Sequence, residues 1–375
     1  MAGIYIHIPF CKSKCIYCDF YSGTQFHLKD DFIKSLLLEI ESRKQYIGNE
    51  SINTIYFGGG TPSLLSKSDL TTIFNSLYKN YSIHSNPEIT MECNPDDLDS
   101  KVLYDFNDLG INRLSIGTQS FNNQILKFFN RLHSAECAFN SVLLAQESGF
   151  SNISLDFIYN VPGLSDEILL DTLQKVEKLQ VQHLSFYDLT VSEKTKLYWY
   201  VKNQKVVIPG EHQSLNNFFQ IYQFLKEAGF HHYEISNYAK PGFESLHNSN
   251  YWNQVPYIGF GPSAHSYNIH SRQWNISSLI RYNNYINRNL KWYEIECLTD
   301  RDKYNDYIVT NLRTYHGFDL YFIKNQYDEE IFNHFNANIN LLHSKGFFYT
   351  FDGNKFLPSI DDLLKADYIA KYLII

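Results

Sequence analysis

Residues 4–18 of the chain read IYIHIPFCKSKCIYC. The stretch begins with an alternating apolar run that predicts a β-strand, and three cysteines, Cys11, Cys15 and Cys18, follow it closely. Cysteine thiolates are the ligands of iron–sulfur cubanes. Because the CxxxCxxC spacing offers only three of them, one iron of a [4Fe–4S] cluster would stay open to a ligand that is not protein. The motif therefore predicts cofactor chemistry at the start of the chain.

Other interpretations of the three cysteines are open at this point. A zinc site takes four nitrogen or sulfur ligands, and its fourth ligand would have to be His7, which alternates with apolar neighbours on the predicted strand. A disulfide is disfavoured because three clustered cysteines are an odd number and nothing before them resembles a secretory leader. Cys93, Cys137 and Cys297 are isolated in the sequence, and we expect ordinary buried thiols there.

The composition predicts a globular protein with a large core. The chain has 375 residues, of which 44% are hydrophobic and 19% charged, and this length allows two or three domains. A net charge of −8 argues against nucleic acid as the main partner, and the apolar runs are too short to span a bilayer. Without a leader-like segment, and with a cluster that needs reducing conditions, we expect a cytoplasmic location.

Strand-like and helix-like segments alternate through the first half of the chain. The predicted strands are Gly3–Ile8, Thr54–Phe57, Glu88–Glu92, Arg113–Gly117, Asn152–Phe157 and His183–Tyr187. The predicted helices are Asp30–Gln45, Lys67–Tyr81, Ser100–Leu109, Ser134–Ser148 and Asp166–Leu179. This alternation predicts an α/β fold in which helices cover a parallel sheet. Six such units predict an incomplete (β/α)6 barrel over residues 1–190.

Unusual residues follow these strands at their carboxyl ends, where barrels carry their chemistry. The second strand leads into Gly58-Gly59-Gly60-Thr61-Pro62. Glycines let a ligand lie directly against the backbone, so we expect this run to bind the ammonium and carboxylate of an amino-acid ligand. A tight turn before a helix that begins near Pro62 is the structural alternative. The lysine of a Walker phosphate loop is absent.

Four polar side chains lie at or just beyond the predicted strand ends: Glu92, Gln119, Arg131 and Asp156. A buried carboxylate needs a partner, and a ribose diol or a cation can serve. Arg131 is a natural counter-ion for a carboxylate. Taken alone, each of these residues could instead form a salt bridge that only stabilises the fold. Together they predict a zwitterionic ligand that carries a nucleoside.

The strand–helix rhythm breaks over residues 191–297, which we interpret as an extension of the barrel. A helix-like segment covers His212–Ala228, and residues 247–252 read HNSNYW. An imidazole beside two large aromatic rings can be a haem ligand, although a histidine among aromatic residues is also a common structural feature. From about residue 298 the pattern predicts a smaller α+β, winged-helix-like domain of two or three helices, with a strand pair near Phe347–Phe356 around Asp352-Gly353.

Several segments together resemble the radical S-adenosylmethionine superfamily, and specifically the HemW-type haem chaperones, which are relatives of oxygen-independent coproporphyrinogen III oxidase. The matching segments are YIHIPFC at residues 5–11 with the two later cysteines, FGGGTPS at 57–63, RLSIGTQSF at 113–121, the run at 233–239, and HNSNYW, which is similar to the HNxxYW sequence of the chaperones. Phe20 stands where the oxidase has a further cysteine, and the oxidase's N-terminal extension is missing. Asn130 and Asn160 replace common glycines.

The resemblance implies a set of cofactors and of residues that bind them. Cys11, Cys15 and Cys18 would hold a [4Fe–4S] cluster whose open iron chelates S-adenosylmethionine, and His247 would bind haem. By position, the residues that match the oxidase's contacts to S-adenosylmethionine or its neighbourhood are Tyr5, Tyr17, Gly59, Gly60, Thr61, Glu92, Gln119, Arg131, Asp156 and Thr190.

The resemblance also implies a function and partners. We expect a haem chaperone that passes haem to an acceptor haemoprotein. Both soluble and membrane-associated acceptors are consistent with this function. A homodimer is compatible with the family. The alternative is an oxidase that decarboxylates porphyrinogen propionates by radical chemistry. A radical enzyme that acts on a substrate other than haem is a third hypothesis.

Overall fold

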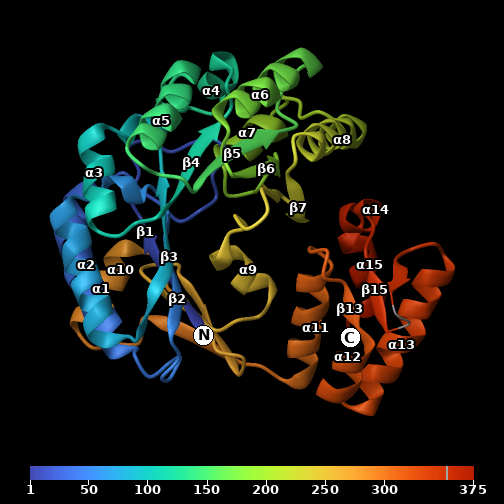
Figure 1. Cartoon of the computed structure of the whole chain (residues 1–375). Helices are drawn as coiled ribbons and strands as arrows, with labels where there is room; N and C mark the ends of the chain where they lie inside the picture. Colours follow the sequence, from blue (N-terminus) through green and yellow to red (C-terminus); the bar gives the residue numbers. More distant parts are fainter. Residues whose placement is uncertain (352–353) are drawn as a thin grey trace.

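The computed structural model describes residues 1–351 and 354–375. Six parallel strands form its centre in the order of the chain (Figure 1). They are β1 (Ala2–Ile8), β2 (Ile52–Gly59), β3 (Ile83–Cys93), β4 (Arg113–Gln119), β5 (Ile153–Tyr159) and β6 (His183–Asp188). All six predicted strands are therefore confirmed, and so is the α/β barrel class.

Helices cover the outer face of these strands. They are α1 (Lys29–Ser42), α2 (Lys67–Asn80), α3 (Ser100–Asp108), α4 (Asn123–Phe128), α5 (Ala135–Glu147) and α6 (Asp166–Leu179). Serine side chains fix several of the starts, since Ser66, Ser134 and Ser165 each accept a hydrogen bond from the first turn of α2, α5 and α6. The five predicted helices are confirmed. The short α4 was not predicted, because six residues are too few to show a helical period.

The strands alternate between two environments. On β1, Ile4, Ile6 and Ile8 are fully buried in one hydrophobic core with the helices, and Tyr5 and His7 point to the other face. The same alternation runs through the other parallel strands, whose second face carries mainly polar side chains. The inner face of the barrel is therefore a polar cavity wall and not a second apolar core.

The stretch after β6 continues the same sheet at both edges. β8 (Asn237–Ala239) and β7 (His231–Glu234) add antiparallel strands beside β6, and β9 (Tyr257–Phe260) pairs in parallel with β1. Beyond β9 the strands are β10 (His265–Tyr267), β11 (Ser271–Asn275) and β12 (Tyr293–Cys297). The helices of this stretch are α7 (Lys196–Lys202), α8 (Glu211–Glu227), α9 (Leu246–Trp252) and α10 (Leu279–Asn287). It therefore extends the barrel and shares its core.

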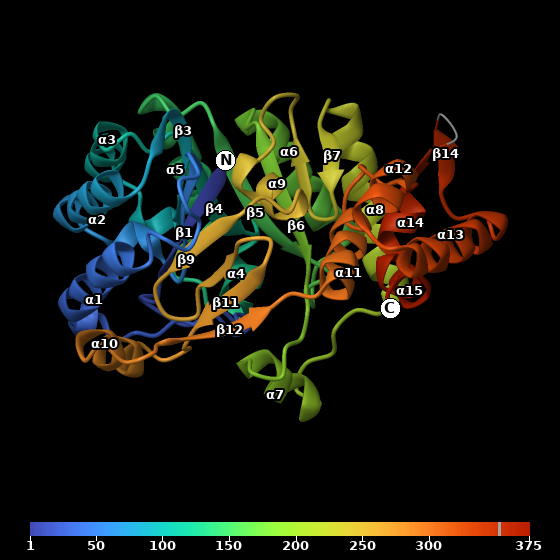
Figure 2. The same ribbon diagram turned by 90° about the horizontal axis from the view of Figure 1, so that it is seen from below.

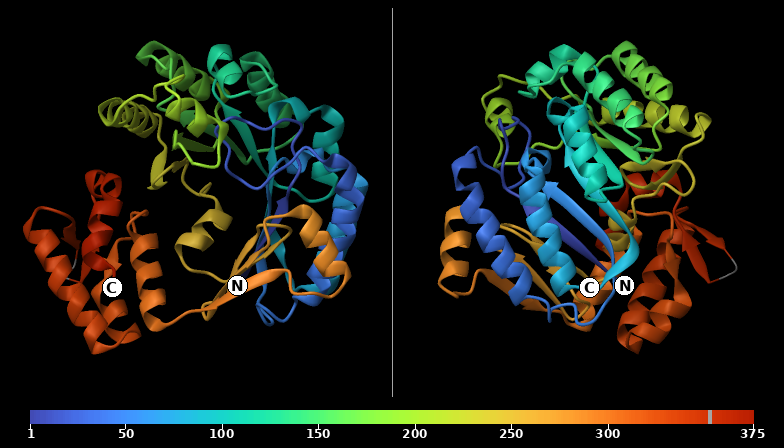
Figure 3. Two further views of the ribbon diagram at one scale, coloured as in Figure 1. Left: turned by 180° about the vertical axis from the view of Figure 1, so that it is seen from behind. Right: turned by 60° about the vertical axis from the view of Figure 1, so that its left-hand side comes forward.

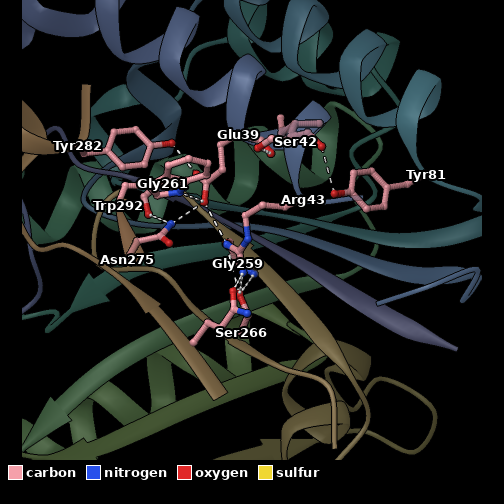
Figure 4. Close-up of polar contacts among 12 residues, drawn as sticks. Glu39, Ser42, Arg43, Tyr81, Gly259, Gly261, Ser266, Asn275, Tyr282 and Trp292 are labelled. Carbon is pink, nitrogen blue, oxygen red and sulfur yellow. Dashed lines mark hydrogen bonds and ion pairs between the residues drawn. The ribbon is translucent and has the colours of Figure 1, made fainter. Parts of the chain in front are cut away.

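A buried ion pair on α1 fastens this extension to the barrel (Figure 4). Glu39 and Arg43 are at most 6% exposed, and their carboxylate–guanidinium distance is 3.0 Å. Arg43 also donates to the carbonyl oxygen of Gly259 (2.8 Å), while Glu39 accepts from Asn275 (2.7 Å) and the Tyr282 hydroxyl (2.5 Å). Since every bond reaches a different segment of the extension, the pair fixes how β9, β11 and α10 sit against α1.

The C-terminal part has its own hydrophobic core. It contains α11 (Asp300–Asn311), β13 (Phe318–Asp319), α12 (Leu320–Gln326), α13 (Glu329–Ser344), β14 (Tyr349–Phe351), β15 (Lys355–Leu357), α14 (Ile360–Leu364) and α15 (Ala366–Leu373). Figures 2 and 3 place these helices at one end of the molecule, on the side of β7 and α8 and away from α1 and α2.

The number of helices predicted for the C-terminal part needs correction. Five helices occupy this part where two or three are predicted, because α12 and α14 are too short to produce a clear periodic pattern. The predicted turn residues Asp352 and Gly353 lie outside the described residues.

Among the isolated cysteines, Cys93 is buried as expected, but Cys137 is only partly buried and Cys297 is exposed.

Candidate functional site

A cavity of about 460 Å³ lies at the carboxyl ends of the parallel strands, and Cys11, Cys15 and Cys18 line it. We call it the cysteine cavity. The other predicted residues in its lining are Tyr17, Gly59, Gly60, Thr61, Glu92, Gln119, Arg131, Asp156 and Thr190. Of the predicted site residues, all of which the structure describes, only Tyr5 and His247 lie outside this lining. The structure thus brings together residues that are spread over the first 190 positions.

The loop that carries the cysteines is tied to the turn after α4. The amide of Ile16 donates to the carbonyl oxygen of Phe129 (3.2 Å), and the side chain of Asn130 donates to Ser13 Oγ (2.9 Å) and Lys14 O (3.0 Å). Asn130 adopts a φ of 62°, a left-handed conformation that asparagine tolerates better than most residues. The replacement of a common glycine by Asn130 therefore preserves the turn and adds two hydrogen bonds to the cysteine loop.

The three thiols lie close enough to affect one another. Burial, together with the neighbouring Cys15 and Cys11, raises the pKa of Cys18 to about 11. Thr61 Oγ1 donates to Cys11 Sγ (3.5 Å) and Arg131 Nη1 to Cys15 Sγ (3.6 Å). Two of the three sulfurs thus already accept hydrogen bonds from side chains of the cavity wall.

The donor set agrees with a cluster better than with one ion. In the described part of the chain, no three side chains of histidine, cysteine, aspartate or glutamate are arranged to hold a single metal ion. A [4Fe–4S] cube does not need that arrangement, because each thiolate binds a different iron. His7 also offers no free nitrogen, since Nε2 contacts Tyr21 O (2.7 Å) and Nδ1 contacts the Tyr5 hydroxyl (3.1 Å).

The glycine run serves the packing of the chain as much as any ligand. Gly59 has a φ of +106°, and a Cβ there would lie 2.5 Å from the ring of His7. A Cβ on Gly60 would lie 2.6 Å from Phe10 O. The amides of both glycines are already used, by Glu92 Oε2 (3.1 Å) and Ile8 O (2.8 Å). The expectation that these amides bind a ligand carboxylate is therefore wrong, and contacts of this run to an ammonium group would be made by carbonyl oxygens.

Glu92 is a buried carboxyl group on the inner face of β3. Its oxygens accept from the Tyr56 hydroxyl (2.9 Å) and the Gly59 amide (3.1 Å). Burial nevertheless raises its pKa to about 7, because desolvation disfavours the charged form more than two hydrogen bonds favour it. An ammonium group of a ligand beside Glu92 would restore the charged form.

Asp156 and Arg113 bring further buried charge into the same cavity. Asp156 accepts from the hydroxyls of Ser115 (2.9 Å) and Ser154 (3.4 Å), and burial raises its pKa. Arg113 is 1% exposed, and its Nε has no hydrogen-bond partner among the described residues. Unused polar capacity of this kind suits a polar, charged ligand.

Arg131 lies at the cysteine end of the cavity. Nη2 donates to Asn94 Oδ1 (2.6 Å) and Gly117 O (2.8 Å), so the guanidinium is held in place before any ligand binds. Thr190, another lining residue, is exposed and donates to Asp188 O (3.3 Å). The arrangement puts a fixed positive charge beside the thiols and a solvent-accessible hydroxyl in the lining.

The sequence reading missed most of the inner face. Besides Arg113, the unpredicted lining residues on the strands include Tyr56, Ser115, Ser154, His183, Ser185 and Tyr187. A signal for them was present, because strands such as Arg113-Leu114-Ser115-Ile116 and Ser154-Leu155-Asp156-Phe157 alternate polar and apolar residues. Strands of a parallel sheet that is buried on both faces read as continuous apolar runs, so this alternation marks a polar interior.

His247 lies on α9 and is 2% exposed. Both of its ring nitrogens have partners: Nδ1 contacts Thr54 Oγ1 and Nε2 contacts the Tyr251 hydroxyl, each at 2.8 Å. Its backbone amide donates to Glu88 (2.9 Å). Burial lowers the pKa of the imidazole to about 3, so the ring is neutral. His247 thus fastens α9 to β2 and β3.

A second cavity, of about 590 Å³, adjoins the cysteine cavity. We call it the aromatic cavity, because Tyr5, Tyr21, Tyr251, Tyr257 and Tyr267 line it. Asp19 and Phe20, which follow the third cysteine, line both cavities. The opposite wall comes from α11, which also packs against α9. Of its lining residues, the sequence marked only Tyr5 and, within HNSNYW, Tyr251 as candidates for a cofactor site.

Among the described residues, the longest apolar helices fall short of what is needed to cross a lipid bilayer.

Comparisons with known proteins show which family shares these features. A family model of the radical SAM superfamily matches residues 5–176. This superfamily implies a [4Fe–4S] cluster and S-adenosylmethionine. The heme chaperone HemW of Buchnera aphidicola from Acyrthosiphon pisum is 35% identical over 351 residues, which cover 92% of this chain and 91% of that protein. The heme chaperone HemW of Bacillus subtilis is 30% identical and covers 100% and 99%.

A solved structure is similar over nearly the whole chain. It is coproporphyrinogen III oxidase (HemN) from Escherichia coli, which its description calls a radical SAM enzyme. The TM-score is 0.86 at 23% identity, with 99% of this chain and 89% of that chain covered. At this level of identity the likeness establishes the fold, including the C-terminal part.

Proposed function

The chain belongs to the family of HemW-type haem chaperones within the radical SAM superfamily, and from this premise we propose that it binds haem and transfers it to an acceptor haemoprotein. The observation that carries the proposal is the aromatic cavity beside the cysteine cavity. A cavity of about 590 Å³ lined by tyrosines has the size and apolar character of a cofactor site.

The cysteine cavity is the proposed site of the [4Fe–4S] cluster and S-adenosylmethionine. Cys11, Cys15 and Cys18 are its proposed iron ligands. Arg131 and Glu92 carry the charges that a ligand carboxylate and ammonium require. When bound, the cluster supplies an electron to the sulfonium cofactor. The protein's own contribution is to hold the cofactor against fixed charges in a largely buried cavity, with Asp156 and Thr190 proposed as further contacts.

His247 remains a predicted haem ligand. For it to bind iron, Tyr251 would have to release Nε2 or Thr54 would have to release Nδ1. The oxidase hypothesis rests on the shared fold alone, which does not decide chemistry.

Anaerobic reconstitution with iron and sulfide, followed by haem titration with and without S-adenosylmethionine, tests the proposal. We expect a Soret band that saturates at one haem per chain, and its loss when an apo-haemoprotein is added. A parallel incubation of the reconstituted protein with coproporphyrinogen III tests for oxidase activity. Turnover of the porphyrinogen, or no haem uptake by the intact chain, would contradict the chaperone proposal.

Two statements on partners and one on location also belong to the proposal. They are an acceptor that is a haemoprotein, a cytoplasmic location, and a homodimer. Size-exclusion chromatography with light scattering before and after reconstitution measures the last of these directly.

A further inference from the structure

The walls of the aromatic cavity suit a flat, conjugated ligand. Tyr251 and Tyr257 meet edge to face with ring centroids 4.6 Å apart, and Tyr267 lies 6.3 Å from Tyr257 at an interplanar angle of 33°. The rings come from α9, β9 and β10; the sheet pairs β9 with β1 and β10, and Arg43 donates to Gly259 on β9 and Ser266 on β10. Rings held in this way offer a preformed apolar surface for a macrocycle to pack against.

His247 does not offer a nitrogen to this cavity. Its ring is almost completely buried, both nitrogens are hydrogen-bonded, and the side chain that separates it from the cavity is Tyr251. An iron-binding histidine normally keeps one nitrogen for the metal and bonds the other to a neighbouring group. In the present arrangement neither nitrogen of His247 is available.

His265 has the opposite character. It lines the aromatic cavity and is exposed, and in the described part of the chain its ring nitrogens have no hydrogen bond within the protein. Its backbone is fixed, because it pairs with Trp274 across β10 and β11. Gly259 is packed so closely that a Cβ there would lie 2.1 Å from His265 O. The backbone of His265 is therefore fixed, its ring lies beside that of Trp274 (centroids 6.4 Å apart), and both ring nitrogens are open to a metal in the cavity.

We propose that haem occupies the aromatic cavity with His265 as the axial ligand of its iron, and that His247 is a positioning residue that holds Tyr251 and α9 in the cavity wall. This inference rests on the proposed function, since it presupposes that the chain binds haem. The imidazole of His265 donates a lone pair to the iron, and no bond of the protein is broken.

The charged residues of the cavity offer little to the propionates of a haem. They are Asp19, Arg272 and Asp306. Arg272 on β11 is ion-paired with Asp306 on α11, and Glu296 lies 3.6 Å away. A haem propionate would meet Arg272 in competition with these carboxylates, so the propionates gain little there and the iron–imidazole bond must supply much of the affinity. Haem in this position would lie beside Asp19 and Phe20, and hence directly next to the cysteine cavity.

The test compares haem titrations of the full chain and four variants by absorption and electron paramagnetic resonance. We expect His265→Ala to lose the spectrum of a histidine-ligated haem and to bind haem at least about tenfold more weakly. Added imidazole should restore the spectrum. His270→Ala is the matched control, because it removes an exposed histidine of the neighbouring turn that does not line the cavity.

His247→Ala and Tyr251→Phe separate positioning from ligation. Positioning predicts that His247→Ala weakens haem binding but leaves the histidine-ligated spectrum intact, and that Tyr251→Phe also keeps this spectrum. Wild-type affinity and spectrum in His265→Ala would overturn the inference and leave the proposed function standing. Loss of the histidine signature in His247→Ala alone would also overturn it. No haem uptake by the wild-type chain would overturn the proposed function as well.

Discussion

The cysteine cavity and the aromatic cavity adjoin each other, but the chain builds them in different ways. The first collects residues that lie on the parallel strands or directly follow them, and each of the six strand–helix units contributes to its lining. The second collects Tyr5 from the first strand, rings from the extension, and side chains of α11 near the C-terminal end. The difference teaches that a site built by a repeated topological unit leaves local motifs in the sequence. A site built where separate parts meet leaves few, and here the local motif HNSNYW marks only Tyr251.

Removal of a cysteine should break the first cavity and spare the second. We expect Cys15→Ala, reconstituted anaerobically, to retain almost no iron and sulfide, because a cluster held by three thiolates loses a third of its protein ligands. Haem affinity should fall far less than metal content, because the two cavities share only Asp19 and Phe20 of their lining residues. Exposed Cys297 provides the control, Cys297→Ala. Unchanged metal content in Cys15→Ala would refute the assignment of the cluster.

Loss of Glu39 should disturb the aromatic cavity and spare the cysteine cavity. Glu39→Ala leaves the buried Arg43 without its carboxylate partner, which destabilises a protein by about 3–5 kcal/mol. Because the network holds β9, β11 and α10, we expect haem affinity to fall with stability, as measured by urea unfolding and haem titration.

The control for that experiment is Glu41→Ala, which removes an exposed carboxylate from the same helix and should change the unfolding free energy by about 0.5 kcal/mol or less. Equal stability of the two variants would mean that the buried network does not secure the extension.

Glu92→Gln should reveal the strain of burying charge in the cysteine cavity. The pKa of Glu92 is raised from 4.5 to about 7, so between these values the folded state binds a proton that the unfolded state does not. The wild-type chain therefore loses stability as the pH rises through this window, by about 3 kcal/mol in total. We expect the unfolding free energy of Glu92→Gln minus that of wild type to grow by this amount from pH 5 to pH 8.

The difference between variant and wild type is the right quantity, because carboxyl groups that do not interact with Glu92 titrate equally in both; Asp156 is the neighbouring carboxyl group whose charge acts on Glu92. Glu136→Gln, which removes an exposed carboxyl group on α5, should show no such growth. A flat difference for Glu92→Gln would mean that Glu92 is ionised at low cost in the folded chain.

The ion pair at the edge of the aromatic cavity should have the smallest effect. Arg272 and Asp306 keep side-chain exposures of 37% and 26%, and pairs that water reaches contribute about 1 kcal/mol or less. We expect Asp306→Asn to lower the free energy of unfolding by no more than this in a urea titration. A loss as large as that of Glu39→Ala would show that the C-terminal part depends on this pair for its position.

Much of the barrel was readable in advance. Period-two and period-3.6 patterns located six strands and five helices, because each element must bury one face against the next. The rim residues were readable for a related reason, since the carboxyl ends of parallel strands meet at one edge. The short elements α4, α12, α14 and β7–β12 were not, because three to seven residues carry too little periodicity.

The sequence by itself determined the cysteine loop, the strand–helix order and the residues at the strand ends, since these depend on spacing along the chain. Only the tertiary structure decided that the glycine run is required by His7 and Phe10, that Tyr251 and Thr54 occupy both nitrogens of His247, and that His265 remains free. The physical reason is that hydrogen-bond partners and cavity walls come from segments up to about 300 residues apart, and their meeting follows from packing and not from any local pattern.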